Sequence, residues 1–163
     1  MDAKLRVMLD TNIYDALVLG KGTVFAKAVR HSDRVVVYGN KVIRGELRRM
    51  PRGIKWNGRN ARNWLLNTYD FVVGRHNLET GEVVNFLALK YWDEYNGAQS
   101  FGKIISDFII VACASIHSLD IVCSEDNRTM RTKGCLRIYR KVNRRDGLRI
   151  PRFIGFREFE KLV

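Results

Sequence analysis

The chain has 163 residues, of which 46% are hydrophobic and 28% charged; this is typical of one globular domain and excludes a disordered or low-complexity protein. Its 29 lysines and arginines outnumber 17 aspartates and glutamates, so the formal net charge is +12 at pH 7. A field of this sign attracts polyanions. We therefore expect nucleic acid as the first partner and an anionic membrane surface only as the second.

The apolar runs are too short for a signal peptide or a membrane span. The longest, residues 108–114, falls far below the ~20 residues that a transmembrane helix requires. The cysteines, Cys113, Cys123 and Cys135, show no CxxC spacing, so neither a disulfide framework nor a zinc site is indicated. We expect a soluble, cytoplasmic protein with no membrane association.

The first part of the chain alternates expected strands and helices. Residues 5–9 (LRVML) predict a short strand, and residues 11–31 predict a helix that is broken near Gly20-Lys21-Gly22. Residues 34–38 (RVVVY) form a continuous apolar run, typical of a strand covered on both faces. A turn at Gly39-Asn40 and a helix over residues 41–50, ended by Pro51, are expected next.

The second part continues the alternation. Helices are expected over residues 80–95 and 104–119, and the latter has the apolar spacing of a core helix. Strands are expected over residues 120–124 and 136–142, and a closing helix over residues 156–162. This order predicts an α/β protein: a three-layer α/β/α sandwich with a central, mostly parallel sheet, in a single domain over residues 1–163.

Four acids are expected to meet at one edge of this sheet. Asp10 and Asp126 each follow a strand, and ligand sites in open α/β sheets lie beyond the carboxyl ends of the strands. Asp107 begins the core helix, which runs ~17 Å away before the next strand returns ~20 Å. Glu46 lies in the first turns of the helix that follows the second strand. These residues are the candidate catalytic and metal-binding set.

Each acid also has a structural explanation. Asp10 and Asp126 can cap the segments that follow them, Asp107 suits the start of a helix dipole, and Glu46 can be a solvated helix residue. If the acids do converge, their mutual repulsion calls for a cation among them. An all-oxygen donor set suits Mg²⁺ or Mn²⁺, which can activate water and neutralise a phosphodiester, so hydrolytic nuclease chemistry is predicted.

The order and spacing of four short motifs resemble the PIN-domain ribonucleases, in particular the VapC-type toxins and their archaeal relatives. The motifs are Asp10-Thr11-Asn12 after the first strand, Val42 to Leu47 around the second acid, Asp107 to Ala114 in the core helix, and Ser124-Glu125-Asp126 after the next strand. The resemblance implies a PIN-like fold, a Mg²⁺- or Mn²⁺-dependent endoribonuclease, and supporting roles for Asn12 and Ser124. It also implies a homodimer and an antitoxin as partner, with the chain as the toxin.

Two basic segments are candidates for binding the nucleic acid. The segment over residues 48–67 combines cations with tryptophans, which can track phosphates and stack bases. A second segment over residues 128–149 has nine cations and one acid. Either can also be an ordinary solvated surface. The predicted contacts are Arg48, Arg49, Arg52, Lys55, Trp56, Arg59, Arg128, Arg131 and Lys133.

Two other functions remain open from the sequence. A non-catalytic RNA-binding or RNA-processing scaffold would use the acids only as caps and would bind RNA in a salt-dependent manner. A structure-specific DNA nuclease would share the metal chemistry, because the contacts to the 2′-OH that select RNA cannot be read from the sequence.

Overall fold

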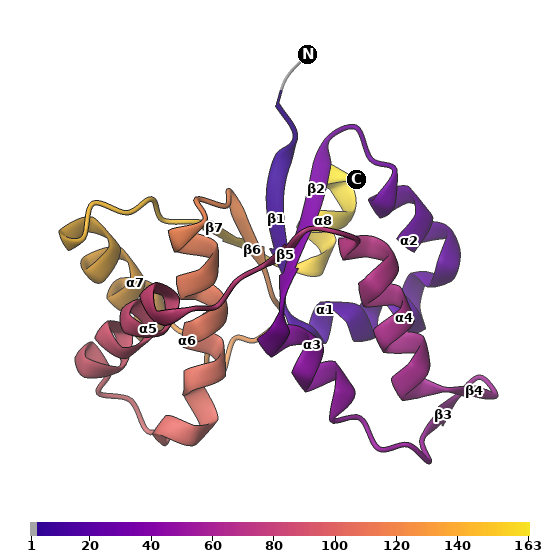
Figure 1. The fold of residues 1–163 in the computed structure, drawn as a ribbon, viewed down its shortest axis with the longest axis horizontal. Helices are drawn as coiled ribbons and strands as arrows, with labels where there is room; N and C mark the ends of the chain where they lie inside the picture. The colour runs from indigo at the N-terminus through magenta and orange to yellow at the C-terminus, as the bar shows by residue number, and fades with distance from the viewer. Residues whose placement is uncertain (1–2) are drawn as a thin grey trace.

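The computed structural model describes residues 3–163 (Figure 1). A sheet of five parallel strands lies at its centre in the order β5-β2-β1-β6-β7. The strands are β1 (Leu5–Leu9), β2 (Val35–Asn40), β5 (Asn77–Leu78), β6 (Ile121–Cys123) and β7 (Arg152–Ile154). Helices cover both faces, so the predicted three-layer α/β/α sandwich is confirmed.

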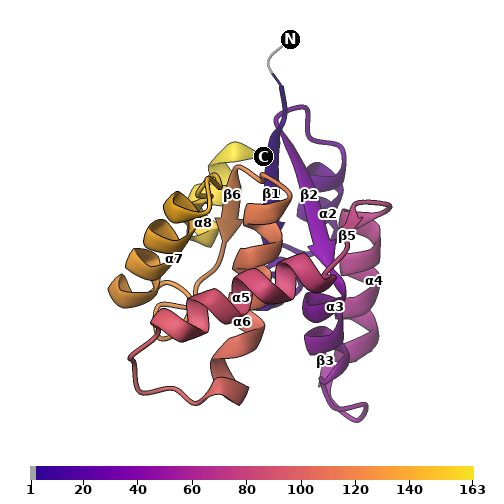
Figure 2. The ribbon, with the colours of Figure 1, turned by 60° about the vertical axis from the view of Figure 1, so that its left-hand side comes forward.

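The helices divide between the two faces of the sheet (Figures 1 and 2). One group contains α1 (Thr11–Ala16), the π-helical segment η1 (Leu17–Lys21), α2 (Gly22–Arg30), α3 (Lys41–Arg48), α4 (Ala61–Val73) and α8 (Phe156–Leu162). The other contains α5 (Glu82–Glu94), α6 (Phe101–Ile116) and α7 (Lys133–Arg145). A small antiparallel hairpin, β3 (Lys55–Trp56) and β4 (Arg59–Asn60), projects beyond α3 and α4.

The strand order reverses beside β1. The chain moves outward from β1 to β2 and β5, and then crosses back to place β6 on the opposite side of β1. Because the crossover helices then cover opposite faces, the carboxyl ends of β1 and β6 flank the point where α/β sheets bind ligands.

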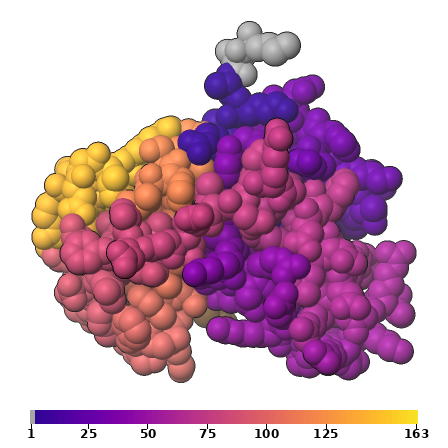
Figure 3. Space-filling model, viewed as in Figure 1, coloured from indigo at the N-terminus to yellow at the C-terminus, as the bar shows by residue number. Residues whose placement is uncertain are grey.

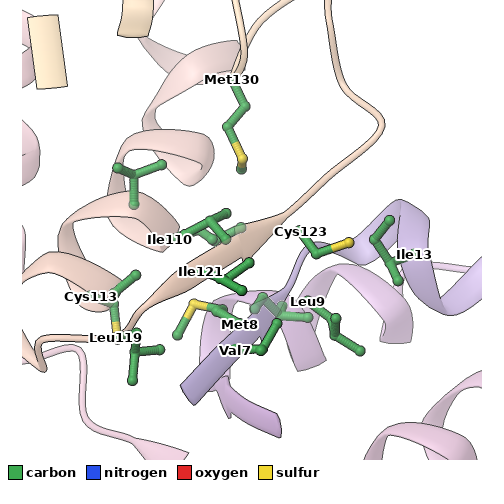
Figure 4. Close-up of a cluster of buried hydrophobic side chains, with 14 of the residues drawn as sticks. Val7, Met8, Leu9, Ile13, Ile110, Cys113, Leu119, Ile121, Cys123 and Met130 are labelled. Carbon is green, nitrogen blue, oxygen red and sulfur yellow. The ribbon is translucent and has the colours of Figure 1, made fainter. Parts of the chain in front are cut away.

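The two central strands are apolar because both of their faces are covered. Val7, Met8 and Leu9 of β1 are fully buried, and so is most of β6 (Figure 4). Helix α6 packs Ile110 and Cys113 against them. Although α6 is strongly apolar, no helix in residues 3–163 combines the length and hydropathy needed to span a bilayer.

The predicted turn at Gly39-Asn40 is wrong, because β2 runs directly into α3. Asn40 is both the last residue of the strand and the N-cap of the helix; its Oδ1 accepts from the backbone N–H of Val42 at 3.0 Å and of Ile43 at 3.1 Å. Glycine is required before it, since a Cβ at Gly39 would lie 2.2 Å from the Tyr69 hydroxyl. The extension by two residues brings α3 to the carboxyl edge of the sheet.

The strand expected over residues 136–142 is also wrong, because these residues belong to α7. Its buried residues recur at the spacing of one helix face: Cys135, Ile138, Tyr139, Val142 and Asn143. The helical spacing of these buried residues can be recognised in the sequence only when the segment is taken from Cys135 onward. The last strand of the sheet is instead β7, which pairs with β6.

The remaining expected helices are present, most of them with shifted ends, whereas the closing helix has the predicted bounds. The helix expected over residues 11–31 is interrupted by η1, which ends where Gly22 adopts a positive φ of 64°. Those expected over 80–95, 104–119 and 156–162 are α5, α6 and α8. The basic segment over 48–67 divides into a loop, the β3–β4 hairpin and the first half of α4, which the sequence analysis left unassigned.

Candidate active site

Asp10 lies where β1 ends and α1 begins. Its backbone N–H donates to the carbonyl of Cys123 at 2.9 Å, which extends the pairing of β1 with β6 by one residue. The side chain is only 4% exposed. Its carboxylate accepts from the Ser124 hydroxyl at 2.7 Å, the Thr11 N–H at 2.8 Å and the Asn12 amide at 3.1 Å. Asp10 therefore has a fixed orientation and also acts as the N-cap of α1.

The two predicted supporting residues lie at the Asp10 carboxylate and link it to the loop after β6. Ser124 is fully buried, and its hydroxyl also accepts from the backbone N–H of Asp126 at 3.0 Å. The Asn12 side-chain oxygen accepts from the backbone N–H of Glu125 at 3.1 Å. The loop that carries the fourth acid is thus held against the start of α1.

Asp107 and Asp126 meet at one hydroxyl group. Thr129 Oγ1 lies 2.5 Å from Asp107 Oδ2 and is also hydrogen-bonded to Asp126 Oδ2. The other oxygen of Asp126 accepts from the backbone N–H groups of Arg128 and Thr129, each at 2.9 Å. A hydroxyl has a single hydrogen, so it can donate to only one of the two carboxylates at a time.

Glu46 reaches the same edge from α3. Its Oε2 accepts a hydrogen bond from the Thr11 hydroxyl, and Thr11 is the first residue of α1. The structure therefore connects each of the four predicted acids, directly or through one hydroxyl, to the carboxyl edge of the sheet. Figure 3 shows the surface indented at this lower edge, between the lobe that carries α3 and the lobe that carries α6.

Burial and mutual repulsion perturb this cluster. Burial raises the pKa of Asp10 to about 6, and the charges of Glu46 and Asp126 contribute to the increase against the hydrogen bonds of Ser124 and Thr11. Burial likewise raises the pKa of Asp107 to about 7, with the charges of Asp10, Asp126 and Glu46 adding to it. Both acids therefore bind protons more readily than ordinary aspartates do.

The pKa of Asp126 shifts in the opposite direction because its carboxylate accepts several hydrogen bonds from the protein. Burial alone would raise its pKa, but the Thr129 hydroxyl and the backbone N–H groups of Thr129, Arg128 and Met130 lower the pKa below its usual range. At neutral pH Asp126 therefore stays ionised.

No basic side chain in residues 3–163 forms a salt bridge with any of the four acids. The donor set consists of carboxylate and hydroxyl oxygens, which is the chemistry that Mg²⁺ and Mn²⁺ prefer. Within the same residues, however, no three His, Cys, Asp or Glu side chains converge closely enough to form a metal site as they stand. The Thr129 hydroxyl links Asp107 to Asp126, and the Thr11 hydroxyl bonds to Glu46.

The predicted contacts in the first basic segment begin two residues after Glu46 and lead away from the other acids. Arg48 is in the last turn of α3, and the chain then leads outward to the β3–β4 hairpin at the far end of that helix (Figure 1). Trp56 is half-buried against the core, and the Arg59 guanidinium stacks on Trp64, 5.0 Å from the ring centroid. The remaining members of this group, Arg49, Arg52 and Lys55, are exposed.

The predicted contacts in the second basic segment lie beside the acids. Arg128 is exposed and follows Asp126 in the same loop, and Lys133 is the exposed first residue of α7. Arg131 is half-buried, and its guanidinium donates to the Ser124 carbonyl at 2.5 Å. Arg131 therefore braces the loop of the fourth acid.

The sequence analysis missed Thr11 and Thr129. Thr11 stands inside the Asp-Thr-Asn motif, and Thr129 lies three residues after Asp126, where a hydroxyl commonly completes a local turn. Its place three residues after Asp126 was the sequence signal that could have predicted a contact between Thr129 and that acid. Its contact with Asp107, 22 residues away, had no counterpart in any local pattern.

A surface hollow of about 580 Å³ lies apart from the acids. It is lined by Lys41, Arg44 and residues 77–81. A surface that binds the phosphate backbone of a polymer need not be an enclosed cavity. Among known proteins, no family model matches the chain, and no curated protein matches its sequence.

Proposed function

We propose that the protein is a divalent-metal-dependent endoribonuclease of the PIN-domain type. The observation that carries this proposal is the cluster of Asp10, Glu46, Asp107 and Asp126, of which Asp10 is buried and the other three are partly buried, and which has no salt-bridge partner within the described chain. A protein with 29 basic residues could pair these acids easily. Leaving buried carboxylates unpaired is costly, so the arrangement favours a cation that comes from outside the chain.

The four acids would hold Mg²⁺ or Mn²⁺, exchanging one or more hydroxyl hydrogen bonds for the ion. When bound, such an ion supplies an activated water and neutralises charge on a phosphodiester. Binding would also favour the ionised form of the acids whose pKa values are raised, and should therefore release protons.

The side chains have separate roles in this proposal. Ser124 and Asn12 fix the Asp10 carboxylate, and Thr11 fixes Glu46. Asp107, with a pKa of about 7, can hold or release a proton at Oδ2 near neutral pH, as a group that exchanges protons with water or with a leaving oxygen must. Thr129 connects Asp107 to the ionised Asp126.

A non-catalytic RNA-binding scaffold is the second candidate. It is favoured by the hydrogen bonds that the acids already make: Asp10 caps α1, and Asp126 accepts two backbone N–H groups in its own loop. In this case the acids would be structural, and RNA would bind without a metal requirement.

The test is cleavage of a labelled single-stranded RNA in the presence of Mg²⁺ or Mn²⁺. Asp10→Asn and Asp107→Asn should each reduce the rate by ~10³-fold or more, because each removes a carboxylate from the cluster. Chelation by EDTA should stop the reaction. Asp93→Asn is a matched control, since Asp93 is exposed on α5 and forms no salt bridge within residues 3–163.

A second readout separates catalysis from folding. Mn²⁺ should raise the thermal midpoint of the parent and of Asp93→Asn, but not of the two cluster variants. RNA cleavage that survives in both cluster variants would exclude this site. Binding of RNA without cleavage under any metal would favour the scaffold, and cleavage of DNA in preference to RNA would identify a DNA nuclease.

The homodimer and the antitoxin partner belong to the same proposal. Leu19, Val24 and Phe71 are 52%, 82% and 42% exposed on η1, α2 and α4, which gives an apolar surface suited to a partner. Light scattering should report twice the monomer mass, and Val24→Glu should reduce it to the monomer value. A parent that is monomeric at micromolar concentration would remove the homodimer.

A further inference from the structure

Helix α7 carries a row of cations on the side opposite the core. Lys133, Arg137, Arg140 and Arg144, here called the α7 stripe, recur at spacings of four, three and four residues and are all exposed. At ~100° per residue these side chains fall within ~60° of one another around the helix, opposite the buried residues Cys135 and Val142. The stripe is thus a continuous basic ridge.

The stripe is distinct from the other cations of the helix. Lys141 and Arg145 form salt bridges with Glu94 of α5 at 2.6 and 3.0 Å. Within residues 3–163 the stripe residues form no salt bridge. A surface hollow of about 560 Å³ along the helix is lined only by basic residues: Arg137, Arg140, Lys141, Arg144 and Arg145.

The stripe begins at the acidic site and leads away from it. Thr132 caps α7 and follows Thr129, which contacts Asp107 and Asp126, by only three residues. From Lys133 to Arg144 the helix rises ~17 Å at ~1.5 Å per residue. One strand of nucleic acid carries a phosphate every ~3.4 Å in a stacked helix, so the stripe can face about five successive phosphates.

We propose that the α7 stripe binds the phosphate backbone of the RNA strand on one side of the acidic site. An anionic membrane is a poorer match, because a membrane-binding helix exposes apolar side chains beside its cations. The exposed large hydrophobic residues of the described chain include none on α7. That the bound polymer is RNA rests on the proposed function. The inference adds a surface that binds several successive nucleotides, which the four acids alone do not require.

The test measures binding without catalysis. A fluorescent 12-nucleotide unstructured RNA is titrated in EDTA at several salt concentrations, with anisotropy as the readout. The variant is R137Q/R140Q/R144Q; the matched control, K27Q/R75Q/K161Q, removes the same charge from exposed residues on other elements. Circular dichroism checks that both variants fold.

The stripe variant should bind about tenfold or more weakly at moderate salt, and the slope of log K against log salt should fall by ~2, since each phosphate contact on a single strand contributes ~0.7. The control should lose much less. R137K/R140K/R144K should retain most of the affinity. Equal losses in the stripe variant and the control, or none in either, would overturn the inference.

Two further outcomes separate this inference from the proposed function. If the stripe variant loses binding to anionic lipid vesicles while its RNA affinity is unchanged, the stripe is a membrane surface and the inference is overturned. If the parent cleaves RNA, the stripe variant should show a raised KM with kcat nearly unchanged. If the parent cleaves nothing, the proposed function fails. The salt dependence of RNA binding still decides whether the α7 stripe binds RNA.

Discussion

Asp10 lies at the carboxyl ends of the central strands and Asp120 at their amino ends, and the two side chains have different partners. Asp120 precedes β6; its carboxylate accepts from the backbone N–H of Arg6 at 2.7 Å and is paired with the Arg149 guanidinium at 2.6 Å. Asp10 follows β1 and, although it is more deeply buried, has hydrogen bonds but no cation. The fold therefore neutralises an acid at one edge and concentrates acids at the other.

Under the proposed function, this difference separates a structural carboxylate from a metal-binding one. An acid that stabilises the fold has partners that compensate for its loss of water, as Asp120 does. The cluster at the carboxyl edge has hydrogen bonds but no cation, and although these bonds lower the pKa of Asp126, the pKa values of Asp10 and Asp107 are raised. Stability given up in this way is commonly found at sites where function requires unpaired charge.

The largest expected effect on stability is at Asp10. Because its folded pKa is raised from 3.8 to about 6, the folded state binds more protons than the unfolded state between these values, and stability falls as the pH rises through this window. At ~1.4 kcal/mol per tenfold change, the upper bound is ~3 kcal/mol. Asp10→Asn should be more stable than the parent by ~1 to 3 kcal/mol at pH 8, and no more stable at pH 4, in urea unfolding.

The same substitution at the opposite edge provides the control. Asp120→Asn should destabilise the protein at pH 8 by ~1 kcal/mol, because it weakens the bond to the Arg6 N–H and removes the charge that faces the partly exposed Arg149. If Asp10→Asn and Asp120→Asn changed the free energy of unfolding at pH 8 in the same direction, the distinction between the two acids would be contradicted.

A smaller effect is expected at Thr129. Its hydroxyl lowers the pKa values of Asp107 and Asp126, so Thr129→Val should raise the pKa of Asp107 above its value of about 7. Carboxyl-carbon NMR titration should detect an increase of a fraction of a pH unit to ~1 unit. Thr129→Ser retains the hydroxyl and should leave the pKa close to the parent value; a decrease in Thr129→Val would show that the hydroxyl does not stabilise the ionised form.

The sequence determined the elements whose patterns are local. The apolar run of β1 and the helical spacing of α6 arise from burial on two faces and on one stripe, and both can be read from neighbouring residues. The positions of Asp10, Asn12, Ser124 and Asp126 after strands also follow from local order, because parallel strands place their carboxyl ends at one edge.

Other features required the tertiary structure because they depend on residues far apart in the chain. Gly39 and Asn40 resemble a turn in isolation, but Tyr69 packs over the glycine and the amide caps α3. Helix α7 contains so many basic residues that its narrow apolar face is hard to recognise in the sequence. The face is evident in the structure, where it packs against the core.

The charges illustrate the same limit most clearly. Lys141 and Arg145 are indistinguishable in sequence from Arg140 and Arg144, yet the first two meet Glu94, about 50 residues away, and the others face solvent. Composition alone fixed the sign of the field. Which cations are paired, and which acids are left without a cation, was decided by the packing of α5 and α7 and by the order of the strands, because electrostatic energy depends on distances that only the folded chain sets.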